Sequence, residues 1–416
     1  MSYVVDKDSS TPLHLQIKEY ILDYISNNKT GSRRLQSENE LSRHFGISRP
    51  TIRLALAALA KDSIIEKIQG KGTFIKENRT ELQFINWQAT EEATAGSLQH
   101  ILDSFIRKRP DVGIENIGCL FKDVLPHLIV KTGSGNASDI MSLLYFWIPL
   151  LVEQGSLYPL DKLYTEEFRS KLYSMSIDAV KYKNNYYGLN WANGPTIFYY
   201  NRKIIREVTG SPEIKIEYFD ELFDLFDKID SHYRGTVLPY CLPLHDDDLY
   251  FMYTIYSFLL SFRGGITDAD GDIILNSENT IRAFTWLKKF IGRGESAIGS
   301  GYLKARHEFA HNRLAFFIDG PWFKSVVPTM NKEEPVEIGF QTLPRSEIGL
   351  SYSALANHVL AISNQCRNKE VAVELINHIA MDPAISEYYY LKSNMFPASR
   401  EEAMTNPLTT ILSVAC

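Results

Sequence analysis

The chain has 416 residues, more than a single hydrophobic core usually serves, so we expect two or three domains. A composition of 44% hydrophobic and 23% charged residues excludes a disordered chain and a fibrous one. The charge is uneven, because residues 1–79 hold 13 Lys and Arg against 9 Asp and Glu, whereas the whole chain has a net charge of −6. A basic N-terminal part of this kind suits a polyanionic partner.

The N-terminal segment lacks the features of an export signal. "MSYVVDKDSS" is acidic where a signal peptide is basic, and no apolar segment follows it. The longest apolar runs, "LLYFWIPLLV" and "YFMYTIYSFLLSF", are shorter than the roughly 20 residues of a membrane-spanning helix. We therefore expect a cytoplasmic protein with no membrane partner.

The cysteines and histidines predict neither a metal site nor a cofactor. Cys119, Cys241, Cys366 and Cys416 are far apart and form no C-x-x-C pair, which indicates reduced thiols rather than disulfides or a zinc site. Histidine spacing is not expected to supply metal ligands either.

Two helices are predicted at the start of the chain. The first runs from about Leu13 to Ser26 and carries an apolar stripe at helical spacing, formed by Leu15, Ile17, Ile21, Leu22 and Ile25. The second begins after Ser37, because Ser37 followed by Glu40 three residues later is a capping box.

The stretch "GISRPTIRLAL", residues 46–56, predicts a tight turn followed by a third helix. Gly46 tolerates the positive φ of the turn, and Pro50 is acceptable only in the first helical turn, where its missing N–H has no intrahelical partner. Arg49, Thr51 and Arg53 then project from the N-terminal end of this helix. In a helix-turn-helix that end enters the DNA major groove, where Arg pairs with guanine.

"IIEKIQGKGTFIKE" follows and predicts a β-hairpin with a small, basic tip. Gln69, Gly70, Lys71 and Gly72 form this tip, and they place no bulky side chain between the backbone and a phosphate. The hairpin is therefore interpreted as the wing of a winged helix.

From Thr11 to Ile75 the sequence resembles the GntR family of bacterial transcription regulators, in particular through "LQSENELSRHFGISRPTIRLALAALAKDSIIEKIQGKGTFI". The resemblance implies a DNA-binding head over residues 1–79. The candidate DNA-binding residues are Ser37, Arg49, Pro50, Thr51, Arg53, Gln69, Gly70, Lys71 and Gly72. A helix-turn-helix that contacts only protein is the alternative.

Residues 80–416 alternate helical stripes with short apolar strands, which is typical of an α/β domain. "SLQHILDSFIRK" and "NTIRAFTWLKKFI" are predicted helices, whereas "LQFINW", "SDIMSL", "LAFFI" and "HVLAIS" are predicted strands.

Five phrases of this body, in order, resemble the family 1, sugar-type solute-binding proteins of bacterial ABC importers. They are "ILDSFIRKRPDVGIE", "GNASDIMSLLYFWIPLLVEQGSLYPLDKL", "YYGLNWANGPTIFYYNRKII", "NRLAFFIDGPWFKSVV" and "ANHVLAISNQCRNKEVAVELINHI". The predicted fold class is an α+β winged helix-turn-helix head followed by an α/β, two-lobed, periplasmic-binding-protein-like body of type II.

The resemblance implies a carbohydrate site in the body, because sugars are bound by flat aromatic rings and short polar side chains. Trp322 matches a common sugar-stacking tryptophan. The candidate ligand-binding residues are Trp87, Tyr145, Trp147, Trp191, Asn193, Asp319, Trp322 and Asn357, and core packing is the alternative for each aromatic residue. Residues 245–248, "HDDD", are more typical of a solvated loop than of a cation site.

A DNA-reading head with a ligand-binding body predicts a transcription regulator, most simply a repressor, that responds to a carbohydrate. Reading double-stranded operator DNA at two half-sites requires two heads, so we expect a homodimer. A transport receptor is the alternative. A glycoside-cleaving enzyme is a third class, but no catalytic motif supports it.

Overall fold

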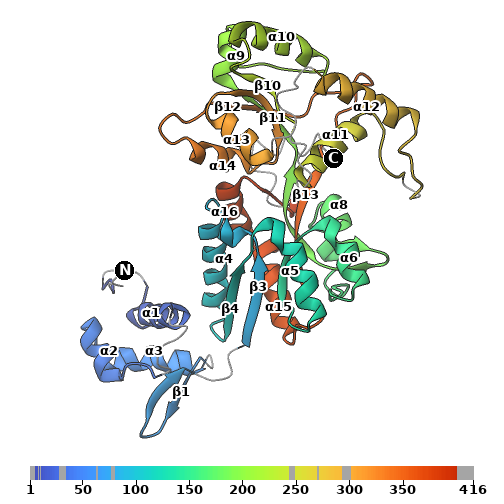
Figure 1. Cartoon of the computed structure of the whole chain (residues 1–416). Coiled ribbons are helices and arrows are strands. Elements are labelled where there is room, and N and C mark those ends of the chain that lie inside the picture. The colour runs from blue at the N-terminus through green and yellow to red at the C-terminus, as the bar shows by residue number, and fades with distance from the viewer. Residues whose placement is uncertain are drawn as a thin grey trace. The chain divides into compact units, whose positions relative to one another are not determined.

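We describe a computed structural model of the whole chain (Figure 1). The structure describes residues 5–7, 9, 11–27, 34–61, 64–75, 80–242, 249–268, 271–292 and 301–400. The segment 245–248 lies outside these residues.

The head is a three-helix domain with a two-stranded wing, as the sequence predicts. Its elements are α1 (Leu13–Asn27), α2 (Glu38–Phe45), α3 (Arg49–Lys61), β1 (Ile65–Ile68) and β2 (Gly72–Ile75). β1 and β2 pair antiparallel, with Ile68 opposite Gly72. The tip between them turns through positive φ at Gly70 and Gly72, where a side chain would be strained.

The predicted capping box is present, because Ser37 Oγ accepts from the Glu40 amide while the Glu40 carboxylate accepts from the Ser37 amide. Gly46 ends α2 at a φ of 63°. The head core contains the apolar stripes of the three helices, including Ile17 and Ile52. Leu15 is a correction, since 39% of it is exposed and it lies outside the core.

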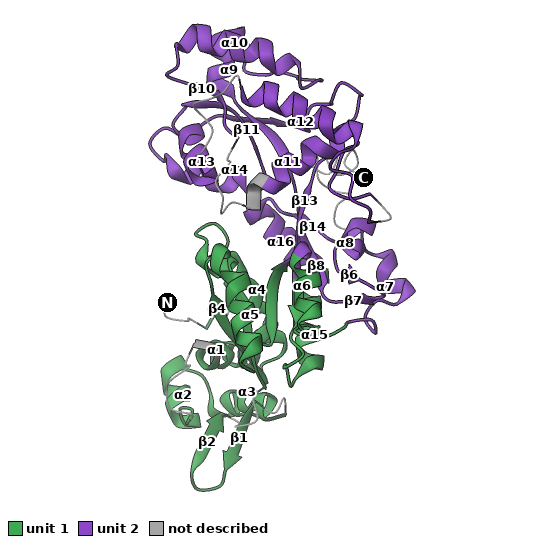
Figure 2. Ribbon diagram, turned by 45° about the vertical axis from the view of Figure 1, so that its right-hand side comes forward, with its two compact units in different colours: residues 1–143, 147–159, 360–382 green, residues 144–146, 160–359, 383–416 purple. Residues whose placement is uncertain are grey.

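The chain divides into two compact units, and each is discontinuous in sequence (Figure 2). Unit 1 comprises residues 1–143, 147–159 and 360–382, and unit 2 comprises residues 144–146, 160–359 and 383–416. Strand β13 (Leu355–Ile362) begins in unit 2 and ends in unit 1.

Beyond the head, unit 1 is built on parallel strands with helices. β3 (Thr80–Asn86) pairs in parallel with β4 (Val112–Gly118) and with β5 (Ile140–Leu144). Its remaining elements are η1 (Gln88–Thr90), α4 (Ala95–Lys108), α5 (Phe121–Gly133), α6 (Ile148–Glu153) and α15 (Lys369–Met381), and η2 (Tyr145–Trp147) spans the boundary to unit 2. Parallel pairing is the arrangement that βαβ connections produce.

Unit 2 contains a four-stranded sheet in the order β10-β11-β9-β12. These strands are β9 (Ile197–Asn201), β10 (Leu238–Tyr240), β11 (Leu314–Asp319) and β12 (Ile338–Gln341). β11 lies parallel to β10 and antiparallel to β9. All residues of β9 and β11 are buried, because apolar clusters pack on them.

The larger helices of unit 2 are α9 (Arg202–Thr209), α10 (Glu221–Tyr233), α11 (Leu249–Ser261), α12 (Glu278–Ile291), α13 (Tyr302–Ala310) and α16 (Pro383–Ser393). Shorter helical elements are α7 (Glu166–Ser170), α8 (Ser174–Asp178), α14 (Phe323–Val326) and η4 (Val327–Met330). Three further pieces of strand are β6 (Lys181–Tyr182), β7 (Asn185–Tyr186) and β14 (Phe396–Pro397). β14 pairs antiparallel with β8 (Leu189–Pro195).

Within the described part of the chain, every helix is too short or too polar to cross a bilayer. Cys119, Cys241 and Cys366 are free thiols.

Candidate DNA interface and ligand pocket

The predicted DNA-contact residues face solvent on the head. All are exposed except Thr51, which is half-buried and lies with its Oγ1 atom 2.7 Å from Ser48 Oγ. They come from three places: the N-cap of α2, the first turn of α3 and the tip between β1 and β2. The backbone amides at the N-terminus of α3 are partly positive and form part of this surface.

The Arg53 side chain is exposed but takes part in an ion pair. Its guanidinium donates to Glu38 Oε2 at 3.1 and 3.3 Å, and Lys67 Nζ donates to Glu38 Oε1 at 2.9 Å. These two cations hold the pKa of Glu38 below its usual value, Lys67 contributing most. Glu38 therefore links α2, α3 and the wing. Its two partners lie 15 and 29 positions away along the chain, so no local sequence pattern predicted this arrangement.

The predicted ligand-binding residues fall into two groups that belong to different units. Trp87 and Trp147 lie in unit 1, where their rings contact each other edge-on at 6.3 Å and both contact Phe121. Both tryptophans are at least 96% buried, so here they pack in an aromatic cluster. The other six belong to unit 2.

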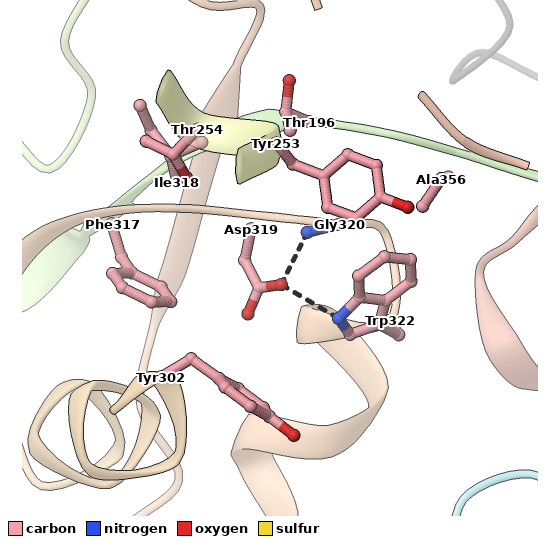
Figure 3. Close-up of a pocket in the computed structure, with 11 residues that line it drawn as sticks. Thr196, Tyr253, Thr254, Tyr302, Phe317, Ile318, Asp319, Gly320, Trp322 and Ala356 are labelled. Carbon is pink, nitrogen blue, oxygen red and sulfur yellow. Dashed lines mark hydrogen bonds between the residues drawn. The ribbon is translucent and has the colours of Figure 1, made fainter. Parts of the chain in front are cut away.

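In unit 2, a pocket is lined by residues of β8, β11, α11, α13 and β13. Its lining includes Asp319 and Trp322 together with Gly194, Thr196, Tyr253, Thr254, Tyr302, Phe317, Ile318, Gly320 and Ala356 (Figure 3). The enclosed space is about 10 Å³, room for roughly one water molecule. A Cβ at Gly194 or Gly320 would overlap the Trp322 indole, so these glycines let the ring lie against the backbone.

Asp319 holds Trp322 in place rather than facing the pocket with free lone pairs. Its Oδ1 accepts from Trp322 Nε1 at 2.9 Å and from the Gly320 amide at 2.7 Å (Figure 3). Arg306 donates to both carboxylate oxygens, at 2.6 and 3.0 Å, and the paired side chains are only 6% and 2% exposed. Arg306 was not predicted from sequence, because an arginine in "LKARHEFA" has no pattern that marks it as buried.

Three predicted residues on β8 and β13, none of which lines the pocket, carry buried polar atoms with no hydrogen-bond partner among the described residues. They are Trp191 Nε1, Asn193 Oδ1 and Asn357 Oδ1, on side chains of residues at most 3% exposed. Leaving such an atom unpaired costs about 1 to 3 kcal/mol. The amide nitrogens of Asn193 and Asn357 donate to Pro397 O and to Met175 O, so these two side chains contact β14 and α8 rather than the pocket.

His358 connects these positions. Its ring stacks on Trp322 at 6.3 Å and lies 6.4 Å from the ring of Trp191, and its own backbone oxygen accepts from Asn190 Nδ2. Burial lowers the pKa of His358 from 6.5 to about 3, so the imidazole is neutral at physiological pH. Tyr145 lies further out, 36% exposed, and its ring contacts Phe146, which in turn contacts the lining residue Tyr253.

The prediction that histidine spacing offers no ligand pair is wrong. His307 on α13 and His311, the C-cap residue of that helix, are four residues apart, in the stretch "HEFAH". No group of three His, Cys, Asp or Glu suited to a metal occurs within the described ranges.

Comparison with known proteins agrees with both parts of the chain. Residues 13–75 match the family of bacterial regulatory proteins called gntR, and residues 111–409 match the bacterial extracellular solute-binding proteins. The second match covers most of the chain, which therefore belongs to the bacterial extracellular solute-binding protein family and carries a gntR-type winged helix at its N-terminus.

Individual relatives match one part or the other. A maltotriose-binding protein of Pyrococcus abyssi (strain GE5 / Orsay) is 24% identical over 265 residues, 62% of this chain and 52% of the relative. The mannosyl-D-glycerate transport/metabolism system repressor MngR of Escherichia coli (strain K12) is 37% identical over 83 residues, 20% of this chain and 34% of that protein. The chain thus spans about half the length of the first and a third of the second.

Among solved structures, the GacH receptor of Streptomyces glaucescens GLA.O has a TM-score of 0.70 at 16% identity, over 82% of this chain and 88% of that one. This similarity shows the fold alone. It confirms the predicted class, a winged helix-turn-helix followed by a two-lobed solute-binding-protein fold.

Proposed function

We propose that the protein is a cytoplasmic transcription regulator, residues 1–79 reading an operator and residues 80–416 sensing an uncharged carbohydrate. The observation that carries the proposal is one chain holding both a solvent-facing recognition helix with its wing and a pocket lined by Trp322 and Asp319. A head built for DNA gives no advantage to a transport receptor, so that alternative is not favoured.

The chemistry of the pocket supports a neutral ligand. Of its lining residues only Asp319 is charged, and Arg306 neutralises it. His358 is uncharged because burial opposes its protonation. A phosphate or carboxylate would meet no cationic side chain in this lining.

Trp322 is proposed to stack on the apolar face of the sugar, with Asp319 and Arg306 as positioning residues. Because the enclosed space holds only about one water molecule, ligand entry must widen the pocket around this ring. Ligand then changes DNA affinity by preferring one conformation of the body. A homodimer supplies two heads for two half-sites, and ligand-released repression is the simplest direction.

The test combines a thermal-shift screen with DNA binding by the full chain. Neutral mono- and oligosaccharides are expected to raise the melting temperature, because they bind the native state, whereas their phosphorylated or acidic counterparts are not. The operator is selected from random duplexes, and its affinity is measured by fluorescence anisotropy with and without the sugar. Trp322→Ala should abolish the sugar response and keep DNA binding, and Trp286→Phe, at a core tryptophan outside the pocket lining, serves as the matched control.

Failure has two distinguishable forms. If no duplex is bound more tightly than random DNA at low salt, the regulator is refuted. If DNA binds but only charged ligands stabilise the protein, the assignment of the pocket is refuted.

A further inference from the structure

A basic residue outside the predicted DNA-contact set lies against the wing. Arg34 precedes α2, and its backbone pairs antiparallel with Phe74 of β2 in a single bridge. Next to this bridge the Leu35 amide donates to the Thr73 carbonyl at 2.9 Å. Residues 34–35 therefore extend the wing sheet beside β2, and this pairing fixes the backbone from which the Arg34 side chain projects.

The Arg34 side chain extends along the wing toward its tip. Its Nε atom lies 3.3 Å from the position that a Cβ atom would take at Gly72, and its Cζ atom lies 3.8 Å from that position. A larger residue in place of Gly72 would therefore crowd the guanidinium, in addition to straining a backbone with a φ of 120°. Arg34 is exposed, and so is Lys71 at the tip. Two cationic residues thus lie at this end of the wing.

The first turn of α2 lies within reach of the charge on Arg34. Glu40 Oε2 accepts from the Ser37 amide at 2.7 Å and from the Ser37 hydroxyl at 2.8 Å. These hydrogen bonds are the main reason why the pKa of Glu40 lies below its usual value, and the charge of Arg34 lowers this pKa further from a distance. Arg34 therefore lies between two predicted DNA-contact places, the wing tip and the N-cap of α2.

We propose that the Arg34 guanidinium binds a phosphate of the operator backbone between the wing tip and the N-cap of α2. A guanidinium presents several N–H donors in one plane, which suits the oxygen atoms of a phosphate. Such a contact fixes the position of the head on the duplex without reading its bases. The inference rests on the proposed function, because its ligand is the same double-stranded DNA.

The test measures DNA binding by the full chain in fluorescence anisotropy over a series of KCl concentrations. Arg34→Gln should weaken binding to the selected operator and to a random duplex alike, by roughly tenfold. The slope of log affinity against log salt should decrease by about 0.9, because one phosphate contact is lost. Arg34→Lys keeps the charge and should keep this slope. Lys61→Gln, which removes an exposed cation at the C-terminal end of α3, should leave affinity and slope unchanged. Circular dichroism confirms that each variant folds.

A neutral methylphosphonate, introduced at one backbone position of the operator at a time, gives a second readout. At one position in a half-site it should weaken binding by the wild type as much as Arg34→Gln does, and it should weaken binding by Arg34→Gln no further.

Three results would overturn the proposal while the regulator itself still binds DNA. They are wild-type affinity of Arg34→Gln for both duplexes, a loss confined to the operator, and the absence of any methylphosphonate position coupled to Arg34. If the wild type binds no duplex at all, the proposed function and the role of Arg34 are both refuted.

Discussion

The substitution Asp319→Asn tests whether the buried ion pair with Arg306 organises the pocket. The new side-chain amide would keep an oxygen for the Gly320 N–H and for Trp322 Nε1 but would leave the Arg306 guanidinium without a counter-charge at 6% exposure. Removing one partner of a buried pair costs about 3 to 5 kcal/mol. An exposed pair would cost at most about 1 kcal/mol.

The loss of stability in Asp319→Asn should appear in the thermal unfolding transition of unit 2. For a body of this size each kcal/mol lowers the melting temperature by about 2–4 °C, so a decrease of roughly 6–20 °C is expected in scanning calorimetry. Because the pair is buried, 1 M NaCl should change this loss little.

The double variant Arg306→Met with Asp319→Asn provides the control. It removes both charges and keeps an oxygen for the Gly320 N–H and Trp322 Nε1, so it should recover much of the stability that Asp319→Asn loses. The reasoning is refuted if Asp319→Asn loses less than about 1 kcal/mol, or if the double variant is as unstable as the two single variants combined.

Two further predictions concern the head and the pH dependence. Arg49→Ala should cost about 1 to 3 kcal/mol of binding to the selected operator and little on random DNA, whereas Lys71→Ala should weaken both alike; equal losses on both DNAs for both variants would contradict the assignment. The native state binds no proton at His358 until about pH 3, whereas the unfolded chain binds one near pH 6.5. The buried, neutral His358 therefore favours the native state above pH 6.5. This contribution to the free energy of unfolding is lost as the pH falls from 6.5 to 3, with a loss of about 2 kcal/mol by pH 5. Urea midpoints at pH 7.5 and pH 5 should show a smaller acid loss in His358→Gln than in the wild type, with His232→Gln behaving like the wild type; an undiminished loss in His358→Gln would count against buried, neutral His358.

The head could be predicted almost residue by residue because its determinants are local. The capping box needs only Ser37 and Glu40, and the turn needs only a glycine able to adopt φ 63°. The exposed Leu15 was mispredicted, since helical periodicity locates a stripe but does not show where its edge meets solvent.

The pocket was predictable only in part, because its contacts join distant positions. Strand ends suggested Trp191, Asn193 and Asn357, which lie on β8 and β13 but do not line the pocket, so their part in ligand binding stays a prediction. The same reasoning suggested Trp87, which packs against Trp147 in unit 1, and its part in ligand binding also stays a prediction. Asp319 was predicted as a site residue, but its ion-pair partner Arg306 on α13 was not.

The division of the chain constrains how this protein can be cut and recombined. Residues 360–382, which include α15 with its buried Leu375 and Ile376, belong to the same unit as the head although they lie near the other end of the sequence. A fragment that stops before residue 360 would deprive that unit of its last helix and expose the apolar surface the helix covers. Chimeras of this protein should therefore keep residues 80–143 and 360–382 together on the same side of the exchange.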